Sequence, residues 1–197
     1  MIFLYPMKTI NFRYIYERTR QLLLDPKQEW TVIGDEYNNP KDMFRDYLIP
    51  LSVIVSVIVL LFGFLHYTIL EAFFSGLINL VSTTAGTWVC FLICREYMNK
   101  TDQTETTALQ LTVYSSALFI LFHSLATAFG NGFFGQLMSL SSLLFIRTLY
   151  IGIHKTSDLQ SAQKKNLLII MILSIICIPV IMKKILMIIF NIPAFNL

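Results

Sequence analysis

The chain has 197 residues, of which 55% are hydrophobic and 14% are charged, and its formal net charge at pH 7 is +3. This composition offers too little polar surface to coat a soluble domain of this length, so it excludes a soluble all-helical protein with a large core. Within residues 1–47 the basic residues are matched by an equal number of acidic ones, which argues against nucleic-acid binding.

Residues 1–46 are predicted to form a cytoplasmic arm of short helices. Phe12 and Tyr16 recur at helical spacing with other apolar residues, which favours an amphipathic helix at the start of the arm. Such a helix can lie among the lipid headgroups, or it can pack on the inner loops of the protein itself. In the first arrangement its basic side chains meet anionic lipid, and these are Arg13, Arg18 and Arg20.

A second helix of the arm is predicted to begin at Asp25-Pro26. Asp25 can cap the helix, Pro26 suits its first position, and Gln28 stands where a capping-box partner belongs. Trp30 and Ile33 then fall on one face of this helix. Because so short a segment buries too little apolar surface to fold alone, we expect the arm to dock on the membrane or on the bundle.

Residues 47–197 are predicted to form a bundle of membrane-spanning helices. Four stretches contain no Asp, Glu, Lys or Arg, namely 48–65, 72–94, 106–146 and 166–182. A hydrocarbon core of about 30 Å takes about 20 helical residues, so the third stretch is long enough for two crossings. Gly130-Asn131-Gly132 supplies the turn between them. The predicted fold class is an all-α polytopic membrane protein with five spans, at about 47–66, 70–94, 106–128, 132–152 and 166–184, and a short carboxyl-terminal tail.

The distribution of Lys and Arg predicts the orientation of the five spans. Residues 1–47, 95–105 and 147–165 share one side and hold 13 of the 15 basic residues, whereas the other side has Lys183 and Lys184. By the positive-inside rule the amino terminus is cytoplasmic and the carboxyl terminus is outside. We expect a multi-pass protein of the cell inner membrane, that is, the plasma membrane.

Small and weakly polar residues recur along the second span at steps of three, four or seven. Their simplest role is packing, since small residues let helices approach and polar ones bond across the contact. Alternatively, Asn79 and Thr83 line a polar path for a solute, together with Tyr114 and His123 of the third span. The stripe consists of Gly76, Asn79, Thr83, Gly86, Thr87, Cys90 and Cys94.

Two further polar residues inside the spans are candidate functional residues. His123 is an ionisable group deep in an uncharged stretch, so it is a candidate for a proton or ligand role, with a neutral, satisfied histidine as the alternative. Arg147 lies toward the cytoplasmic end of the fourth span, where its side chain can reach the headgroups. Pairing with an inner-loop carboxylate such as Glu96 is the other role considered for Arg147.

The arm and the start of the first span carry a pattern that resembles a known family, and the similarity extends to the number of spans and the loop lengths. The run Leu24-Asp25-Pro26-Lys27-Gln28-Glu29-Trp30-Thr31-Val32-Ile33 is followed by Glu36 and then by Tyr47-Leu48-Ile49-Pro50-Leu51 at the first span. This pattern resembles the bacterial branch of the Yip family, five-span membrane proteins named for eukaryotic relatives that interact with Ypt/Rab GTPases. The resemblance implies a membrane-organising or trafficking role. The resemblance also implies candidate residues for contact with lipid or a protein partner, namely Pro26, Trp30, Glu36, Tyr47 and Pro50.

No sequence motif indicates an enzyme, a cofactor or a metal site. The chain lacks a His-Glu-x-x-His pair, a Gly-x-Ser-x-Gly elbow and a Gly-Lys-Ser/Thr phosphate loop. We therefore expect a non-enzymatic protein that binds membrane lipids, or a protein partner on the cytoplasmic side, through its arm and inner loops. The alternative is a small-solute or ion transporter or channel with a polar path between the second and third spans.

Overall fold

The computed structural model describes residues 11–35, 40–65, 67–99, 105–130 and 132–190. All regular secondary structure in these ranges is helical. A π-helical turn, Phe44–Leu48, joins α3 to α4. The α-helices are α1 (Phe12–Leu24), α2 (Pro26–Asp35), α3 (Pro40–Met43), α4 (Ile49–Gly63), α5 (Ile69–Asn99), α6 (Glu105–Phe129), α7 (Phe133–Ser141), α8 (Leu144–Thr156) and α9 (Ser161–Ile189).

Five helical segments among the described residues are long and apolar enough to cross a membrane. The predicted fold class, an all-α polytopic membrane bundle, is therefore confirmed. A helix suits hydrocarbon because its backbone hydrogen bonds are made within the segment itself. The five segments are Phe44–Gly63, Ile69–Asn99, Glu105–Phe129, Phe133–Thr156 and Ser161–Ile189.

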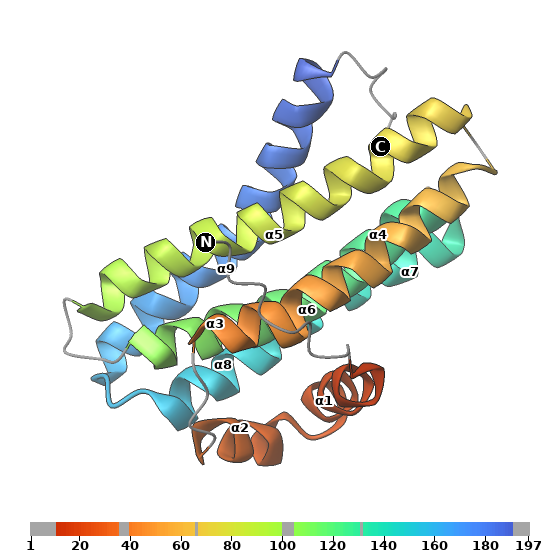
Figure 1. Cartoon of the computed structure of the whole chain (residues 1–197). Coiled ribbons are helices and arrows are strands. Elements are labelled where there is room, and N and C mark those ends of the chain that lie inside the picture. Colours follow the sequence, from red (N-terminus) through yellow and green to blue (C-terminus); the bar gives the residue numbers. More distant parts are fainter. Residues whose placement is uncertain (1–10, 36–39, 66, 100–104, 131, 191–197) are drawn as a thin grey trace, which may run out of the picture.

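The central helix of the bundle is α6. Its residues are buried without a break from Ala108 to Ile120, and it contacts α4, α5, α7 and α8. The last helix, α9, packs mainly along α5. Figure 1 shows the long helices running side by side, with α1 and α2 beneath α6 and α8. The arm therefore meets the bundle at α8 and at the central helix α6.

Local signals in the sequence set where the two arm helices begin. Asn11 caps α1, because its side-chain oxygen accepts a hydrogen bond from the Tyr14 backbone N–H at 3.1 Å. Asp25 caps α2 in the same way, accepting from the Gln28 backbone N–H at 3.2 Å. The helix start predicted at Asp25-Pro26 is confirmed.

The helical hairpin predicted within residues 106–146 is present. Helix α6 ends at Phe129 and α7 begins at Phe133. Between them Gly130 has a φ of +65°, a left-handed conformation that glycine adopts at little cost. The Gly-rich turn of the sequence is thus the point at which the chain reverses.

The fourth crossing is interrupted near its middle. Helix α7 ends at Ser141 and α8 begins at Leu144. At the break the Ser142 hydroxyl donates to the Ser139 carbonyl oxygen at 2.6 Å. The hydroxyl therefore competes with backbone N–H groups for this carbonyl. The sequence shows no proline or glycine here, which is why it predicts a single span without an interruption.

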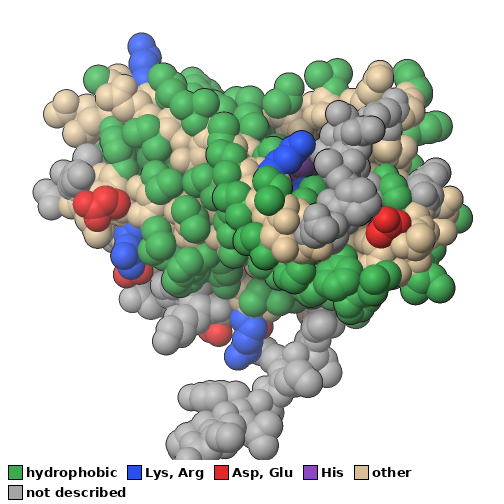
Figure 2. Space-filling model, turned by 90° about the horizontal axis from the view of Figure 1, so that it is seen from above, with side chains coloured by type: hydrophobic (Ala, Val, Ile, Leu, Met, Phe, Trp, Pro, Cys, Tyr) green, Lys and Arg blue, Asp and Glu red, His purple; other side chains and the backbone are tan. Residues whose placement is uncertain are grey.

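The outer surface of the bundle is largely apolar. Figure 2 shows hydrophobic side chains over most of the face seen from above, with few charged groups among them. Contiguous apolar surface of this kind is rare on soluble monomers, whereas lipid tails cover it in a membrane. The exposed side chains of the spans include Val57, Leu61, Leu77, Val81, Ile169, Leu173 and Ile181.

Candidate functional site

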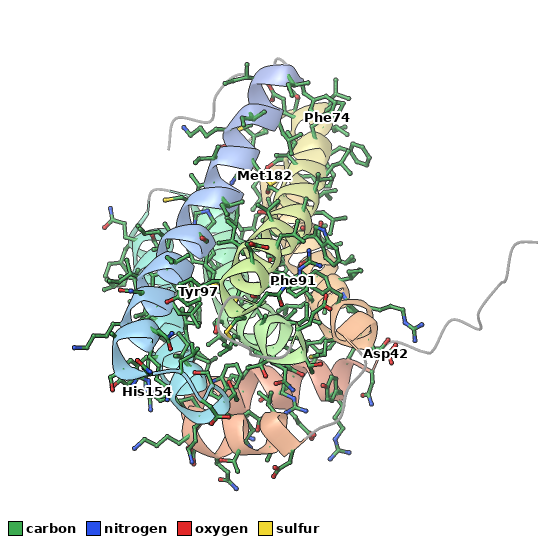
Figure 3. The ribbon with its side chains drawn as sticks, turned by 90° about the vertical axis from the view of Figure 1, so that its left-hand side faces the viewer. Asp42, Phe74, Phe91, Tyr97, His154 and Met182 are labelled. Atoms are coloured by element: carbon green, nitrogen blue, oxygen red, sulfur yellow. The ribbon has the colours of Figure 1, made fainter. Side chains whose placement is uncertain are left out.

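The arm lies across one end of the bundle and packs against it. Helix α2 contacts α8, whereas α1 contacts α2, α6 and α8. Figure 3 shows α1 and α2 crossing beneath the long helices, at the end near Tyr97 and His154 and away from Phe74. We call the buried polar and aromatic residues at this contact the junction: Arg18, Thr19, Glu29, Trp30, Tyr47, Gln110, Tyr114 and Thr148.

A buried ion pair joins the two arm helices at the junction. Arg18 Nη1 donates to Glu29 Oε1 at 2.6 Å, and the two side chains are 5% and 11% exposed. A charge-assisted hydrogen bond this short is among the stronger contacts a protein makes. Since each charge has left water, removing either partner leaves the other buried without compensation. The pair therefore ties α1 and α2 into one unit.

Aromatic rings surround the Arg18 guanidinium. Its central carbon lies 5.2 Å from the ring centre of Tyr14 and 5.5 Å from that of Tyr114, within the range of cation–π attraction. Tyr47, which the π-helical turn carries, packs on Tyr114 with ring centres 5.2 Å apart. The positive charge of Arg18 thus lies between a ring of its own helix, Tyr14, and a ring of the bundle, Tyr114.

Trp30 anchors α2 to α8. Its side chain is fully buried, and its indole N–H donates to the Thr148 carbonyl oxygen at 2.9 Å. The ring lies against Gly152, where an added Cβ would come within 2.6 Å of it. Only a glycine lets the indole approach this closely, and the apolar ring also packs edge-on to Tyr114.

Two more hydrogen bonds fasten backbone groups of the arm to bundle side chains, and a third joins two side-chain hydroxyls. Gln110 Nε2 donates to the Ile33 carbonyl oxygen at 2.9 Å. The Thr148 hydroxyl donates to the Leu22 carbonyl oxygen at 3.3 Å, and the hydroxyls of Thr19 and Tyr47 lie 3.0 Å apart. Because Leu22 and Ile33 lie near the carboxyl ends of α1 and α2, side chains of α6 and α8 satisfy carbonyls that the helices leave without a partner.

The opposite side of α1 is exposed and mixes large apolar with basic side chains. At 3.6 residues per turn these positions fall within about one third of the helix circumference. Tyr16 is 65% exposed and Phe12 is 62% exposed, although the sequence groups them with the buried Ile15. We call this surface the arm face: Phe12, Arg13, Tyr16, Arg20 and Leu24.

Arg18 differs from the other two basic residues that the sequence assigned to lipid contact. Arg13 and Arg20 are exposed on the arm face, and Arg13 pairs with Glu17 at 2.8 Å. The Glu17 carboxylate raises the pKa of the Arg13 guanidinium. Arg18 instead faces Glu29 inside the junction, because it lies on the buried face of α1.

A second polar cluster lies within the bundle, at the stripe that the sequence shows along the second span. Asn79 Nδ2 donates to Ser56 Oγ at 3.0 Å and to Ser124 Oγ at 3.1 Å. The Thr83 hydroxyl donates to the Asn79 carbonyl oxygen of its own helix at 2.8 Å. Asn79 thus links α4, α5 and α6, which is the geometry that helix packing requires.

The remaining candidate residues lie apart from these two clusters or at their edges. His123 is half-buried and stacks on Phe119, with ring centres 5.0 Å apart. Arg147 is exposed on α8, whereas Pro26 and Pro50 are buried. Glu36 lies outside the described residues. No group of three or more His, Cys, Asp or Glu side chains in the described ranges could hold a metal ion.

Sequence reasoning missed several members of the junction. The sequence shows Glu29 only as part of the family-like run, and it predicts no contact of Gln110 or Thr148 with the arm. The acceptors of Gln110 and Thr148 are backbone carbonyls, which leave no trace in the sequence. A glutamate one residue before a tryptophan on a predicted buried helix face was a usable signal for Glu29.

A family model described as the Yip1 domain matches residues 20–182 of the chain. The chain belongs to the Yip1 domain family. The match covers most of the arm, the junction residues from Glu29 onward and the bundle as far as Met182, while Arg18 and Thr19 lie just before it. Searches of curated proteins and of solved structures found no match to this chain.

Proposed function

We propose that this Yip1-family protein acts without catalysis, by holding the arm face in a fixed position at the cytoplasmic surface of the membrane for contact with lipid or a protein partner. The observation that carries the proposal is the division of α1 into two faces. Ile15, Arg18 and Leu22 are buried on one face, whereas Phe12 and Tyr16 on the other remain exposed.

A fixed surface binds more tightly than a mobile one, because less conformational freedom is lost on contact. The Arg18–Glu29 pair and the bond from Trp30 to the Thr148 carbonyl hold the arm helices against the bundle. Aromatic and arginine side chains are the types that supply most of the energy at protein contacts, and they also suit a headgroup layer. The arm face combines both types.

The polar residues of the second span favour packing over a solute path. Both amide hydrogens of Asn79 are engaged by serine hydroxyls of neighbouring helices. The Thr83 and Thr87 hydroxyls donate to carbonyls of their own helix. These bonds stabilise the contact of α4, α5 and α6, which supports a proposal that puts the function at the arm.

Site-specific photo-cross-linking in native membranes tests the proposal. A photo-reactive phenylalanine analogue replaces Tyr16 in the full-length protein, and the same analogue replaces Gln28 as a matched control. Both positions are exposed on the arm, but Gln28 lies on α2, outside the arm face. We expect a discrete lipid or protein adduct from position 16 and a background signal from position 28.

The same yield of adducts from both positions would contradict the proposal, since it would show that the arm face is not a preferred contact. The mass of the adduct separates the two kinds of contact. An adduct with lipid mass identifies the headgroup layer as the occupant, and a larger one identifies a protein.

A further inference from the structure

Lys183 is a buried cation near the end of the bundle opposite the arm. It is 6% exposed, although it lies in α9 within a segment apolar enough to cross a membrane. The adjacent Met182 marks its level in Figure 3, well above the end where the arm helices cross. The neighbouring Lys184, by contrast, is exposed. One of two consecutive lysines is therefore directed into the protein.

The Lys183 ammonium has less compensation than its burial requires. Its Nζ donates one hydrogen bond, to Thr127 Oγ1 of α6 at 3.1 Å. An ammonium has three donors, and no ion pair between Lys183 and a carboxylate occurs in the described ranges. Burying a charge without a counter-charge is unfavourable, because the lost hydration is not replaced. The position therefore suits an anion supplied from outside the chain.

A second nitrogen-bearing side chain, His123, lies one turn before Thr127 on the same face of α6. Thr127 donates its hydroxyl hydrogen to the His123 carbonyl oxygen at 3.1 Å. The imidazole stacks on Phe119 with an interplanar angle of 9°. Within the part of the chain that the structure describes, the ring makes no side-chain hydrogen bond. Thr127 thus links Lys183 to the turn of α6 that carries His123, and both side chains have donor capacity left over.

The surroundings of Lys183 favour an anion that is part of a lipid. Ile181 and Ile185, on either side of it along α9, are exposed at 54% and 49%, and hydrocarbon covers such side chains in a membrane. A free anion would have to cross this apolar layer, whereas a phospholipid brings its phosphate to the interface with its tails already in the hydrocarbon. Intramembrane lysines near helix ends commonly reach for this layer.

We propose that Lys183, Thr127 and His123 form a binding site for the phosphate of an anionic phospholipid, between α6 and α9 at the end of the bundle remote from the arm. The ammonium supplies the charge and His123 a second donor, while Thr127 holds the ammonium in place. The site is separate from the arm face and does not depend on the function proposed for it.

Lipid binding by the full-length protein, measured by native mass spectrometry in detergent, tests this site. The probe is phosphatidylglycerol, with phosphatidylcholine as the zwitterionic control and inorganic phosphate as the free anion. Lys183→Met removes the buried charge at similar length, and Lys184→Met removes the exposed neighbouring charge. We expect Lys183→Met to bind phosphatidylglycerol at least tenfold more weakly than the parent, and Lys184→Met to bind it within twofold of the parent.

Lys183→Arg keeps the charge and should retain the binding of phosphatidylglycerol, whereas phosphatidylcholine should bind all four proteins alike. If Lys183→Met does not fold, Lys183→Gln takes its place in the same comparison. Equal binding of phosphatidylglycerol by the parent and the uncharged variant would overturn the proposal. Displacement of the bound lipid by an equal concentration of inorganic phosphate would overturn the lipid assignment.

Discussion

Arg18 and Glu29 lie 11 residues apart in the sequence on two different helices, yet their side chains meet at 2.6 Å in a buried ion pair. The pair fixes how α1 and α2 cross, and the rings of Tyr14 and Tyr114 cover its positive end. The arm is thus held by a polar centre as well as by apolar contact. Its geometry determines which side of α1 remains free.

Arg18→Met should release the arm from the bundle. The substitution leaves the Glu29 carboxylate buried without its partner, a change that costs about 3–5 kcal/mol when a buried pair is broken. Hydrogen exchange of the α1 and α2 amides in the detergent-solubilised protein measures the effect. At about 1.4 kcal/mol for each factor of ten, protection should fall at least a hundredfold in these two helices.

Arg13→Met is the matched control for this experiment. Arg13 is exposed and pairs with Glu17 on the helix surface, where such a pair contributes little. Protection of α1 in Arg13→Met should stay close to that of the parent. An equal loss of protection in both variants would show that the buried pair does not hold the arm.

Gly152→Ala should weaken the contact of α2 with α8. The added methyl would lie 2.6 Å from two atoms of the Trp30 ring and 2.9 Å from the side chain of Leu111. The indole is tied to the Thr148 carbonyl and cannot easily move away, so we expect a loss of about 1–3 kcal/mol. This loss of stability should appear as a lower melting temperature of the purified protein and as faster proteolysis of the arm.

Gly34→Ala, in the same pair of helices, should stabilise the protein slightly where Gly152→Ala destabilises it. Gly34 is exposed near the end of α2, and a Cβ there would have Thr156 as its nearest neighbour, at 4.0 Å. Alanine favours the helix over glycine by about 0.5–1 kcal/mol. A decrease in melting temperature equal to that of Gly152→Ala would mean that space around Trp30 is not the cause.

Asn79→Leu should loosen the contact of α4, α5 and α6 without abolishing the fold. The variant loses the bonds to Ser56 and Ser124, and hydrogen bonds between membrane helices are worth about 0.6 kcal/mol each, up to about 1.7. We expect a total loss of about 1–2 kcal/mol in thermal unfolding. Thr84→Val should be close to neutral, because the Thr84 hydroxyl bonds only to carbonyls of its own helix. Equal losses of stability in the two variants would contradict the proposed role of Asn79 in helix packing.

The predicted orientation can be tested with single cysteines and a membrane-impermeant maleimide. In a Cys177→Ser background, cysteines replace Lys155 near the arm or Tyr67 in the loop between α4 and α5; both native residues are exposed. The positive-inside rule predicts labelling of position 155 from the cytoplasmic side and of position 67 from the other side. Labelling of both from one side would contradict a layout of five crossings.

The sequence predicts the elements built on local periodicity and turn chemistry well. The small and polar residues at steps of three, four and seven along α5, among them Asn79 and Cys90, are buried. The reversal at Gly130 and the helix start at Asp25 follow from residues whose backbone preference or capping chemistry is local. Absence of charge over long stretches is likewise enough to indicate the membrane class.

The junction depends on relations that no local pattern contains. Arg18 in an amphipathic helix is expected at the surface, and its burial follows from where Glu29 lies once two helices cross. Phe12 and Tyr16 have the spacing of a buried face but are exposed, because Ile15 and Leu22 occupy the contact. Local sequence patterns therefore predict the arm, whereas tertiary packing determines which face of α1 remains exposed.

The distance between α2 and α8 is the most direct test that the arm is fixed to the bundle. Spin labels at Gln28 and Lys155, both exposed, are introduced with Cys177→Ser, and electron paramagnetic resonance records their separation in lipid nanodiscs. A single narrow distance distribution, which Arg18→Met broadens, is the result that the structure predicts. A broad distribution in the parent protein would show a mobile arm and contradict a fixed arm face.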